Sequence, residues 1–307
     1  MTTLVFGHKS PDTDSTGSPL IWAWYLSEIR DEPAEAVLLG EPNTEADFML
    51  RRWDLPKPRI LDTLAPGQKV VIVDTNNPAE LPAAINEADI TAIIDHHKMF
   101  GGLETKGPIE IRMEPLACTA TIMHRMIGDD MGRAPEWVKA TMLTCILSDT
   151  LEFRSPTTTD VDRALAEALA DELGLSIPDY AAEMFAAKSD VSEFSEAELL
   201  RMDSKTFEVG GKTFRVSVLE TTSPETVLAR KAALMDAMPV VAAEDGADQV
   251  LLFVVDILRE QSTLLVPNDL VKQVAESSFA TLCGEADTVV LPGVVSRKKQ
   301  IIPNLTL

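Results

Sequence analysis

The segment His8-Lys9-Ser10-Pro11-Asp12-Thr13-Asp14 places one imidazole and two carboxylates within seven residues, directly after the apolar run Leu4-Val5-Phe6. Side chains on an irregular loop can converge on a single cation, and nitrogen and carboxylate ligands suit divalent ions. The same residue types are also common in ordinary loops, where Asp and Ser form turns. This motif alone therefore leaves two alternatives open, a metal site and a plain turn.

Two later apolar runs also end in side chains that can bind a metal. The run over 69–73 is followed by Asp74, and the run over 90–94 is followed by an Asp-His-His triplet. Continuous apolar runs of this kind are typical of strands that are covered on both faces. Because open α/β sheets bind their ligands beyond the carboxyl ends of the strands, we expect His8, Asp74 and His96 to lie together. The repeated pattern favours the metal site.

An aspartate also stands at the end of the apolar helix predicted over 135–149, where the helix dipole favours cations, so this acid indicates a functional position. Crowded carboxylates repel one another unless cations are bound, and two divalent ions remove the problem. Imidazole and carboxylate ligands without a thiolate suit manganese, cobalt, iron or magnesium better than structural zinc. The predicted metal ligands are His8, Asp12, Asp14, Asp74, His96 and Asp149.

Such a site predicts hydrolysis at phosphorus. Two metal ions roughly 3.5 to 4 Å apart, bridged by a carboxylate and a water, lower the pKa of that water and present hydroxide to a phosphorus atom. The basic run after Ser296 supplies Arg297 and Lys298, which suit phosphate binding, although a solvated surface is the ordinary interpretation of such a run. Lys205 opens a predicted strand and carries little information by itself. His124 lies in an apolar helix and is interpreted as structural.

The elements that must position these residues alternate between strands and helices. Strands are predicted over 36–40, 69–74, 90–94 and 109–113, the last near an edge, and helices over 15–30, 44–52, 80–88, 118–128, 135–149 and 159–173. This order indicates an α/β fold with a doubly wound parallel sheet. Polar residues 189–196 are predicted to link a domain over 1–188 to a smaller α/β domain over 197–307 with a mixed sheet. There we expect a hairpin at Gly210-Gly211, a helix over 224–238 and further strands over 249–256, 263–266 and 288–291.

Composition excludes several classes of protein. The formal net charge of -22 over 307 residues repels phosphate backbones and disfavours nucleic-acid binding. The three cysteines, Cys118, Cys145 and Cys283, lie far apart in apolar surroundings, which is typical of reduced thiols in a cytoplasmic protein. We find no signal peptide and no apolar run long enough to span a membrane. We therefore expect a cytoplasmic enzyme with no nucleic-acid or membrane partner.

The motifs resemble the family II, manganese-dependent inorganic pyrophosphatases of the DHH phosphoesterase superfamily. The resemblance rests on His8 to Asp14, Asp74, Asp95-His96-His97, Ser148-Asp149-Thr150, Ser296-Arg297-Lys298-Lys299-Gln300, Cys118-Thr119-Ala120-Thr121, Ser155-Pro156-Thr157-Thr158-Thr159 and Leu291-Pro292-Gly293-Val294-Val295. It spans both predicted domains. It implies an N-terminal DHH domain that binds metals and a C-terminal domain that binds substrate.

The resemblance also implies a role for each site residue. His8 and Asp12 would bind a first metal, a second would bind Asp14, His96 and Asp149, and Asp74 would bridge the two. His97, Lys205, Arg297 and Lys298 would contact the substrate, with His97 as a candidate proton donor. The implied cofactors are two Mn2+ per subunit, with Co2+ as an alternative, and Mg2+ bound to pyrophosphate. Closure of the second domain over the first and a homodimer formed through the N-terminal domain are also implied.

One position departs from the family. Many members carry His after the bridging aspartate, whereas here Thr75 follows Asp74. A hydroxyl cannot replace an imidazole in a hydrogen-bond relay around the metals, so we expect metal affinity or activity to differ and the reaction to stay the same. No regulatory insertion separates the halves of the first domain.

We therefore expect a hydrolase that converts pyrophosphate to two phosphates by two-metal activation of a bridging water. One alternative is a DHH-type phosphodiesterase acting on oligonucleotides or cyclic dinucleotides, which typically carries a Gly-Gly-His motif that this sequence lacks. Another is a non-catalytic metal or polyphosphate binder, which would need no separate phosphate clamp.

Overall fold

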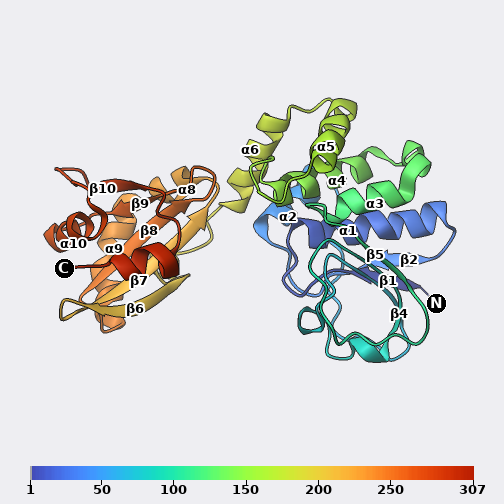
Figure 1. Cartoon of the computed structure of the whole chain (residues 1–307), viewed down its shortest axis with the longest axis horizontal. Helices are drawn as coiled ribbons and strands as arrows, with labels where there is room; N and C mark the ends of the chain where they lie inside the picture. Colours follow the sequence, from blue (N-terminus) through green and yellow to red (C-terminus); the bar gives the residue numbers. More distant parts are fainter. Residues whose placement is uncertain (1) are drawn as a thin grey trace. The chain divides into compact units, whose positions relative to one another are not determined.

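The computed structural model describes residues 2–307, except for the side chain of Lys298. The chain forms two compact units, one reaching to Ala187 and the other running from Lys188 to Leu307 (Figure 1). Among the residues described, no helix is long and apolar enough to cross a membrane.

The N-terminal unit is built on a parallel sheet, as predicted. Its five strands follow the order β2-β1-β3-β4-β5, and every neighbouring pair is parallel. The strands are β1 (Thr3–Phe6), β2 (Ala34–Ala36), β3 (Lys69–Val73), β4 (Asp89–Asp95) and β5 (Glu110–Met113). The first residue of β3 is exposed and the next four are buried, which explains its continuous apolar run. The strand predicted over 36–40 lies slightly earlier, as β2.

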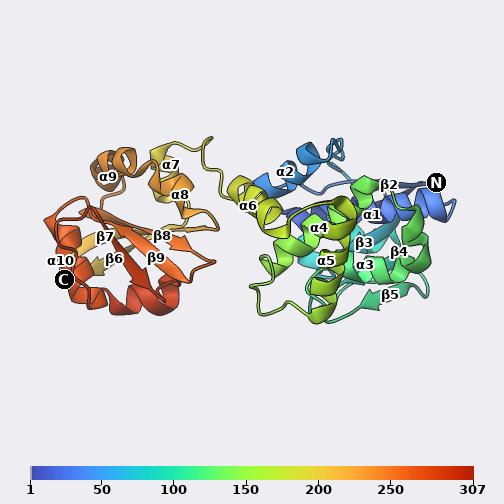
Figure 2. The same cartoon turned by 90° about the horizontal axis from the view of Figure 1, so that it is seen from above.

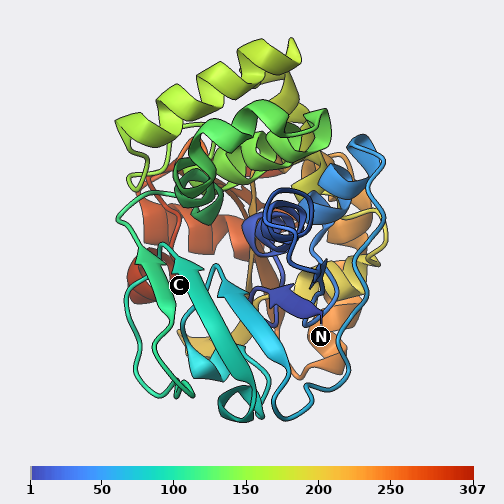
Figure 3. The ribbon, with the colours of Figure 1, turned by 90° about the vertical axis from the view of Figure 1, so that its right-hand side faces the viewer.

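Helices cover one face of this sheet (Figure 3). The helices of the unit are α1 (Thr13–Trp24), α2 (Thr44–Arg52), α3 (Thr119–Ile127), α4 (Glu136–Thr150), α5 (Asp160–Leu173) and α6 (Ile177–Lys188). The main core lies between the sheet and α1, α3 and α4. α1 ends at Trp24 and continues as a π-helical turn, Tyr25–Ile29, so the helix predicted over 15–30 changes type within its length. We did not predict α6.

The opposite face of the sheet packs against irregular segments through a second apolar cluster that includes Leu64, Leu81 and Ile85. The prediction of a helix over 80–88 is wrong. Two short 3₁₀ turns, Pro78–Glu80 and Ile85–Glu87, lie there instead. Pro82 explains the difference, because a proline disfavours the helical conformation in the residue before it, and Leu81 is extended, with φ of -114° and ψ of 165°.

The C-terminal unit contains a mixed sheet, also as predicted. Its order is β10-β9-β8-β7-β6, with β7 parallel to β8 and the other pairs antiparallel. The strands are β6 (Ser204–Val209), β7 (Lys212–Thr221), β8 (Gln249–Asp256), β9 (Gln261–Leu265) and β10 (Thr288–Pro292). All eight residues of the central strand β8 are buried because both faces of the sheet are covered.

Four helices complete this unit. They are α7 (Glu196–Arg201), α8 (Pro224–Leu228), α9 (Lys231–Glu244) and α10 (Asp269–Phe279). Figure 2 shows α7, α8 and α9 on one side of the sheet, where they pack on an apolar cluster of their own. The single helix predicted over 224–238 is interrupted at Ala229 and Arg230 and so forms α8 and α9. We did not predict α7.

The segment predicted as a linker, residues 189–196, packs against the C-terminal unit. The hydroxyl of Ser189 hydrogen-bonds that of Thr222 at 2.9 Å. Val191 is buried in the apolar cluster beneath α9, and its backbone carbonyl accepts a hydrogen bond from Arg230 at 2.7 Å. Its polar sequence therefore covers a surface of this unit and is held there by one apolar anchor.

Candidate metal centre

The loop between β1 and α1 is held tightly against the start of the helix. A side chain on Gly7 would place its Cβ 1.9 Å from the Ser15 hydroxyl, so only glycine fits. The backbone N–H of His8 donates to that hydroxyl at 2.7 Å. Asp12 caps α1, and its carboxylate accepts from the backbone N–H of Ser15 at 3.0 Å. One serine thus fixes both ends of the predicted metal-binding loop.

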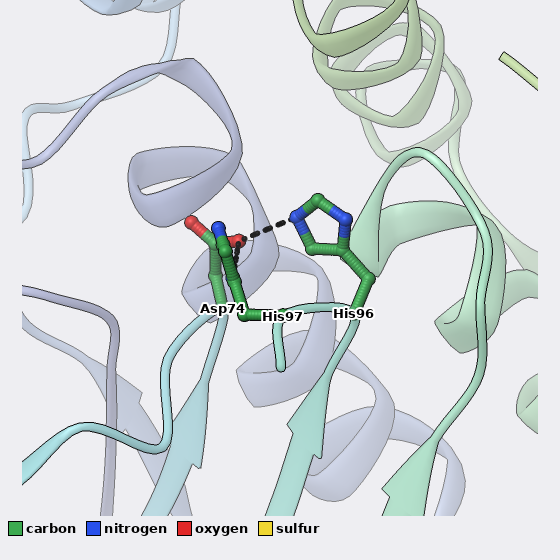
Figure 4. Close-up of side chains that lie close together, drawn as sticks. All are labelled: Asp74, His96 and His97. Atoms are coloured by element: carbon green, nitrogen blue, oxygen red, sulfur yellow. Dashed lines mark ion pairs between the residues drawn. The ribbon is translucent and has the colours of Figure 1, made fainter. Parts of the chain in front are cut away.

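Asp74 lies just beyond β3, where the backbone has φ of 57°. A left-handed conformation costs a non-glycine residue roughly 1–2 kcal/mol and is seen mainly where the surroundings enforce it. The carboxylate is 2% exposed. Its Oδ2 lies 3.6 Å from Nε2 of His8, and its Oδ1 lies 3.4 Å from Nε2 of His96 (Figure 4). Asp74 therefore stands between the two imidazoles.

His96 is oriented by its other ring nitrogen. Nδ1 lies 3.2 Å from the backbone carbonyl of Leu116, so it must carry the proton that this carbonyl accepts. The lone pair of Nε2 then points towards Asp74. A histidine that donates one N–H to a carbonyl and leaves the other nitrogen free is the usual arrangement of a metal ligand.

Asp14 and Asp149 come from helices. Asp14 lies in the first turn of α1 and is 1% exposed. Its carboxylate accepts from the Ser18 hydroxyl at 2.6 Å and from the backbone N–H of Thr119, the first residue of α3, at 2.7 Å. The positive end of α3 therefore supports this acid. Asp149 lies near the end of α4, and its Oδ2 is buried without a hydrogen-bond partner.

The structure brings all six predicted ligands together. Ligand atoms within 4.8 Å of one another form three overlapping groups, namely His8, Asp12 and Asp74; Asp14, His96 and Asp149; and Asp74, His96 and His97. Asp74 belongs to two groups and so does His96. The partnerless Oδ2 of Asp149 fits an ion, because a buried carboxylate oxygen without a donor costs free energy that a cation would recover. The assignment of these six residues as metal ligands remains a prediction.

Electrostatics also favours a cation here. Burial, followed by the charge of Asp14, raises the pKa of Asp74 and of Asp149 well above the usual range of a carboxyl group. Burial likewise raises the pKa of the Cys118 and Cys145 thiols, which therefore stay protonated. The available donors are thus carboxylates and imidazoles, which suit manganese and similar ions.

His97 differs from the buried groups because its side chain is half exposed. Nδ1 lies 2.9 Å from Oδ1 of Asp95 and 3.8 Å from Oδ1 of Asp74. The hydrogen bond to Asp95 raises the pKa of His97. A cavity of about 650 Å³ adjoins the centre, with His8 and His97 in its lining together with Lys9 and Lys98.

Sequence reasoning assigned no role to several residues that support the centre. Besides its backbone contact with Asp14, Thr119 donates through its hydroxyl to Asp74 at 3.3 Å. Glu45 of α2 is fully buried and accepts from the hydroxyls of Thr13 at 3.1 Å and Ser148 at 2.8 Å. It thereby joins the start of α1 to the end of α4. An acid in the first turn of an ordinary amphipathic helix carries no signal of this role.

In the C-terminal unit, the segment carrying Arg297 is tied to the start of β6. The Arg297 guanidinium donates to the backbone carbonyl of Asp203 at 2.7 Å, two residues before Lys205. Lys205 is exposed, and the side chain of Lys298 lies outside what the structure describes. Gln300 closes the loop, because its side-chain oxygen accepts the backbone N–H groups of Val295 and Ser296 at 3.0 and 2.9 Å.

Known proteins match the chain over nearly its whole length. The model of the DHH family, N-terminal domain, matches residues 2–150, and that of the DHHA2 domain matches residues 182–307. A probable manganese-dependent inorganic pyrophosphatase from Deinococcus radiodurans is 42% identical over 309 residues, covering 98% of this chain and 96% of the relative. The chain belongs to the manganese-dependent inorganic pyrophosphatase family. A second member, from Lactobacillus acidophilus, is 37% identical over 304 residues and covers 98% and 97%.

A solved structure also supports the membership of this chain in the family. A putative family II inorganic pyrophosphatase from Methanococcus jannaschii matches with a TM-score of 0.62 and 31% identity, covering 99% of this chain and 98% of that one. An exopolyphosphatase-related protein from Bacteroides fragilis matches with a TM-score of 0.51 at 13% identity, over 98% and 89%, and shares the fold. The predicted membership of the family and the DHH fold are confirmed.

Proposed function

We propose that this chain is a hydrolase that converts inorganic pyrophosphate to two phosphates with the help of bound divalent metal ions. The observation that carries the proposal is the convergence of six carboxylate and imidazole side chains around the buried Asp74. The relatives named as manganese-dependent inorganic pyrophosphatases support the choice of substrate and metal. The division of labour would follow the predicted domains, a metal-binding domain over 1–188, a linker over 189–196 and a substrate-binding domain over 197–307.

We assign two Mn2+ ions per subunit to the overlapping groups, with Co2+ as an alternative. His8 and Asp12 would hold one ion, the other would be held by Asp14, His96 and Asp149, and Asp74 would contact both. The group of Asp74, His96 and His97 shares Asp74 with the first of these sets and His96 with the second, which supports a paired site. Divalent ions supply Lewis-acid activation of water and neutralise charge on the substrate.

The other assigned residues act on the substrate. His97 would donate a proton to the leaving phosphate, since Asp95 holds its ring with Nδ1 engaged and raises its pKa. Lys205, Arg297 and Lys298 would bind the phosphate oxygens of pyrophosphate, which carries Mg2+. The anchoring of Arg297 beside the start of β6 supports a common role for Arg297 and Lys205.

The decisive test is a phosphate-release assay after metals are stripped and restored one at a time. Pyrophosphate should be hydrolysed fastest with manganese or cobalt. A short RNA should be neither cleaved nor able to compete, because the net charge of -22 disfavours polyanions that need many contacts. We expect no cleavage of a cyclic dinucleotide either, since the sequence lacks the Gly-Gly-His motif. Preferential cleavage of either nucleotide would favour a DHH-type phosphodiesterase. Tight manganese binding without any hydrolysis would favour a non-catalytic binder.

We further propose that two copies form a homodimer through β5. This strand is the edge of the parallel sheet, and Ile111 at its centre is 51% exposed. An exposed edge strand with an apolar side chain can pair with a strand of another chain, because its outer backbone N–H and C=O groups have no partner strand. Antiparallel pairing about a two-fold axis at Ile111 would place Glu110 opposite Arg112 of the second copy, so the edge is complementary to itself.

Light scattering at several concentrations tests the homodimer. Arg112→Glu should weaken it, because like charges would then face each other across the axis. The double variant Glu110→Arg with Arg112→Glu should restore the dimer, because opposite charges face each other across the axis again. In both variants the new glutamate at position 112 repels Glu114, which now pairs with Arg112 at 3.1 Å. The double variant therefore separates the effect across the axis from the effect within the strand. Equal dimerisation of all three proteins would place the interface elsewhere. We also propose a cytoplasmic location, which suits three free, buried cysteines.

A further inference from the structure

A buried asparagine joins the segment after β3 to the turn after β4. Asn76 lies two residues beyond Asp74 and is 4% exposed. Its partners are Asp95, the last residue of β4, and Lys98 and Phe100 in the turn after it. Both polar atoms of its side chain are engaged in these contacts, and none of the contacts is with a predicted metal ligand. Its burial and its contacts therefore need a different explanation.

The three contacts of Asn76 require an amide in one orientation. Its Nδ2 donates to Oδ2 of Asp95 at 2.5 Å and to the backbone carbonyl of Lys98 at 3.0 Å. Its Oδ1 accepts from the backbone N–H of Phe100 at 2.5 Å. A carboxylate and a carbonyl only accept and a backbone N–H only donates, so neither an acid nor a hydroxyl of similar size could make all three bonds.

Asp95 divides its two oxygens between Asn76 and His97. Oδ2 accepts from Asn76, while Oδ1 accepts from the backbone N–H of His97 at 3.0 Å and lies 2.9 Å from Nδ1 of its ring. Asp95 is fully buried. Burial opposes its ionisation, yet the hydrogen bonds from His97 and Asn76 bring its pKa below the usual value. A buried carboxylate stays ionised only with such donors.

We propose that Asn76 is a positioning residue for His97, acting through Asp95. It holds the Asp95 carboxylate in one rotamer, and Asp95 holds the His97 ring with its proton on Nδ1, which leaves Nε2 for the substrate. The same amide shapes the turn at Lys98 and Phe100 that follows the ring. The inference rests on the proposed function for the role of His97, whereas the link from Asn76 to the His97 ring can be measured without any substrate.

The kinetic test compares Asn76→Ala and Asn76→Asp with Asn86→Ala. Asn86 is a matched control, because it also bridges the chain after β4, donating to the Gly102 carbonyl at 2.9 Å and accepting from the Glu104 N–H at 3.0 Å, but it is exposed. Loss of a residue that orients a metal-binding side chain typically costs about 10- to 100-fold in activity, and we expect a similar loss for a residue that orients His97. We expect kcat to fall by that factor in both Asn76 variants, with KM and manganese affinity nearly unchanged, and the control to match the natural chain.

The second test reads the His97 ring directly in the metal-free protein. Selective 15N labelling of the imidazoles is practical because the chain has only four histidines. At about pH 9, where an imidazole is neutral, the natural chain and Asn86→Ala should show His97 with its proton on Nδ1. Asn76→Ala should show a mixture of the two tautomers. Asn76→Asp keeps the volume of the side chain, so the kinetic test and the test of the His97 ring are both made with it if Asn76→Ala does not fold.

Two results would overturn the inference. One is an unchanged His97 tautomer in a folded Asn76 variant, whatever its kcat. The other is a loss of activity that is fully recovered at saturating manganese, which would make Asn76 a support of the metal centre. If the natural chain fails to hydrolyse pyrophosphate, the proposed function fails, and the ring spectra still decide whether Asn76 orients His97.

Discussion

Asp203 binds the guanidinium of Arg297 through two of its own atoms. Its carboxylate Oδ1 lies 2.8 Å from Nη2, and its backbone carbonyl accepts from Nη1 at 2.7 Å. The arginine side chain is 18% exposed, whereas Asp203 itself is largely exposed. The pair therefore holds the guanidinium of Arg297 in one place close to Lys205. Because the Asp203 carboxylate is largely exposed, a phosphate group can replace it as the partner of the guanidinium.

Arg297→Ala should weaken the use of pyrophosphate and leave manganese binding intact. A lost charge-assisted hydrogen bond corresponds to about 10- to 100-fold in kcat/KM. Asp203→Ala should give a smaller loss, because the guanidinium keeps its charge and the backbone carbonyl as a partner and loses only the carboxylate. Steady-state kinetics and calorimetric manganese titration check both. Arg259→Ala, an exposed arginine of the same unit, is the control. Unchanged kinetics in Arg297→Ala would remove this arginine from the substrate site.

Asp74→Asn should lose bound manganese and nearly all phosphate release. The amide keeps the shape of the side chain but removes the charge that two of the candidate groups share. Metal content after dialysis and the rate at saturating manganese measure the effect. Asp89→Asn, at the opposite end of β4 from the centre, should behave like the natural chain. Full activity of Asp74→Asn at saturating manganese would contradict a bridging role.

The metal-free protein should become less stable as the pH rises from about 4 towards neutrality. Asp74 and Asp149 have pKa values raised above those of the unfolded chain, so the folded state binds more protons and loses stability as these groups ionise. Thermal unfolding after chelation, compared at about pH 5 and pH 7.5, should show a lower Tm at the higher pH.

Manganese should restore the stability that the metal-free protein loses at neutral pH, and its binding should release protons. Asp149→Asn is the matched control, because it removes one of the two titrating groups while the general repulsion of an acidic chain remains. Its metal-free Tm should depend less steeply on pH. An equal slope in both proteins would assign the pH dependence to the surface charges.

Thr75→Val should weaken manganese binding by about 10-fold. Thr75 follows Asp74 at the position where the resemblance to the family predicts histidine, and its hydroxyl donates to Oε2 of Glu80 at 2.7 Å. Glu80 is one of the carboxylates whose charge acts on His8, so its release reduces the negative potential at that end of the centre. Thr91→Val, which loses a hydrogen bond to the Val70 carbonyl at the other end of the sheet, should have no such effect. Equal affinity in Thr75→Val and the natural chain would make Thr75 a neutral replacement.

The ligands at strand ends could be predicted because the pattern that forms a buried parallel strand also says where that strand ends. Asp74 and His96 follow from this reasoning, and so does the single sheet that joins them. The helix over 80–88 was wrong because it was expected from the alternation of strands and helices, whereas Pro82 disfavours a helical conformation at Leu81. Asn76 and Glu45 could not be found, since their roles depend on partners 19 and 103 residues away in sequence.

Family resemblance added what local patterns could not. Lys205 opens a strand without any distinguishing neighbour, and only the family pattern drew attention to it. The structure adds that β6 begins beside the anchor of Arg297. The left-handed backbone of Asp74 was also beyond reach, because nothing in the order Val73-Asp74-Thr75 requires a positive φ.

The pairing of β1, β3 and β4 in the sheet sets the distances between residues of the metal centre. His8, Asp74 and His96 follow three strands that lie side by side, and hydrogen-bonded strands are spaced about 4.8 Å apart. Their separations are therefore inherited from backbone pairing, and the lengths of the connections between the strands have little influence. Insertions at the exposed residues Asp62 and Thr63, ahead of β3, should be harmless, whereas a slip of β3 by one residue would carry Asp74 about 3.3 Å along the strand axis and dismantle the centre.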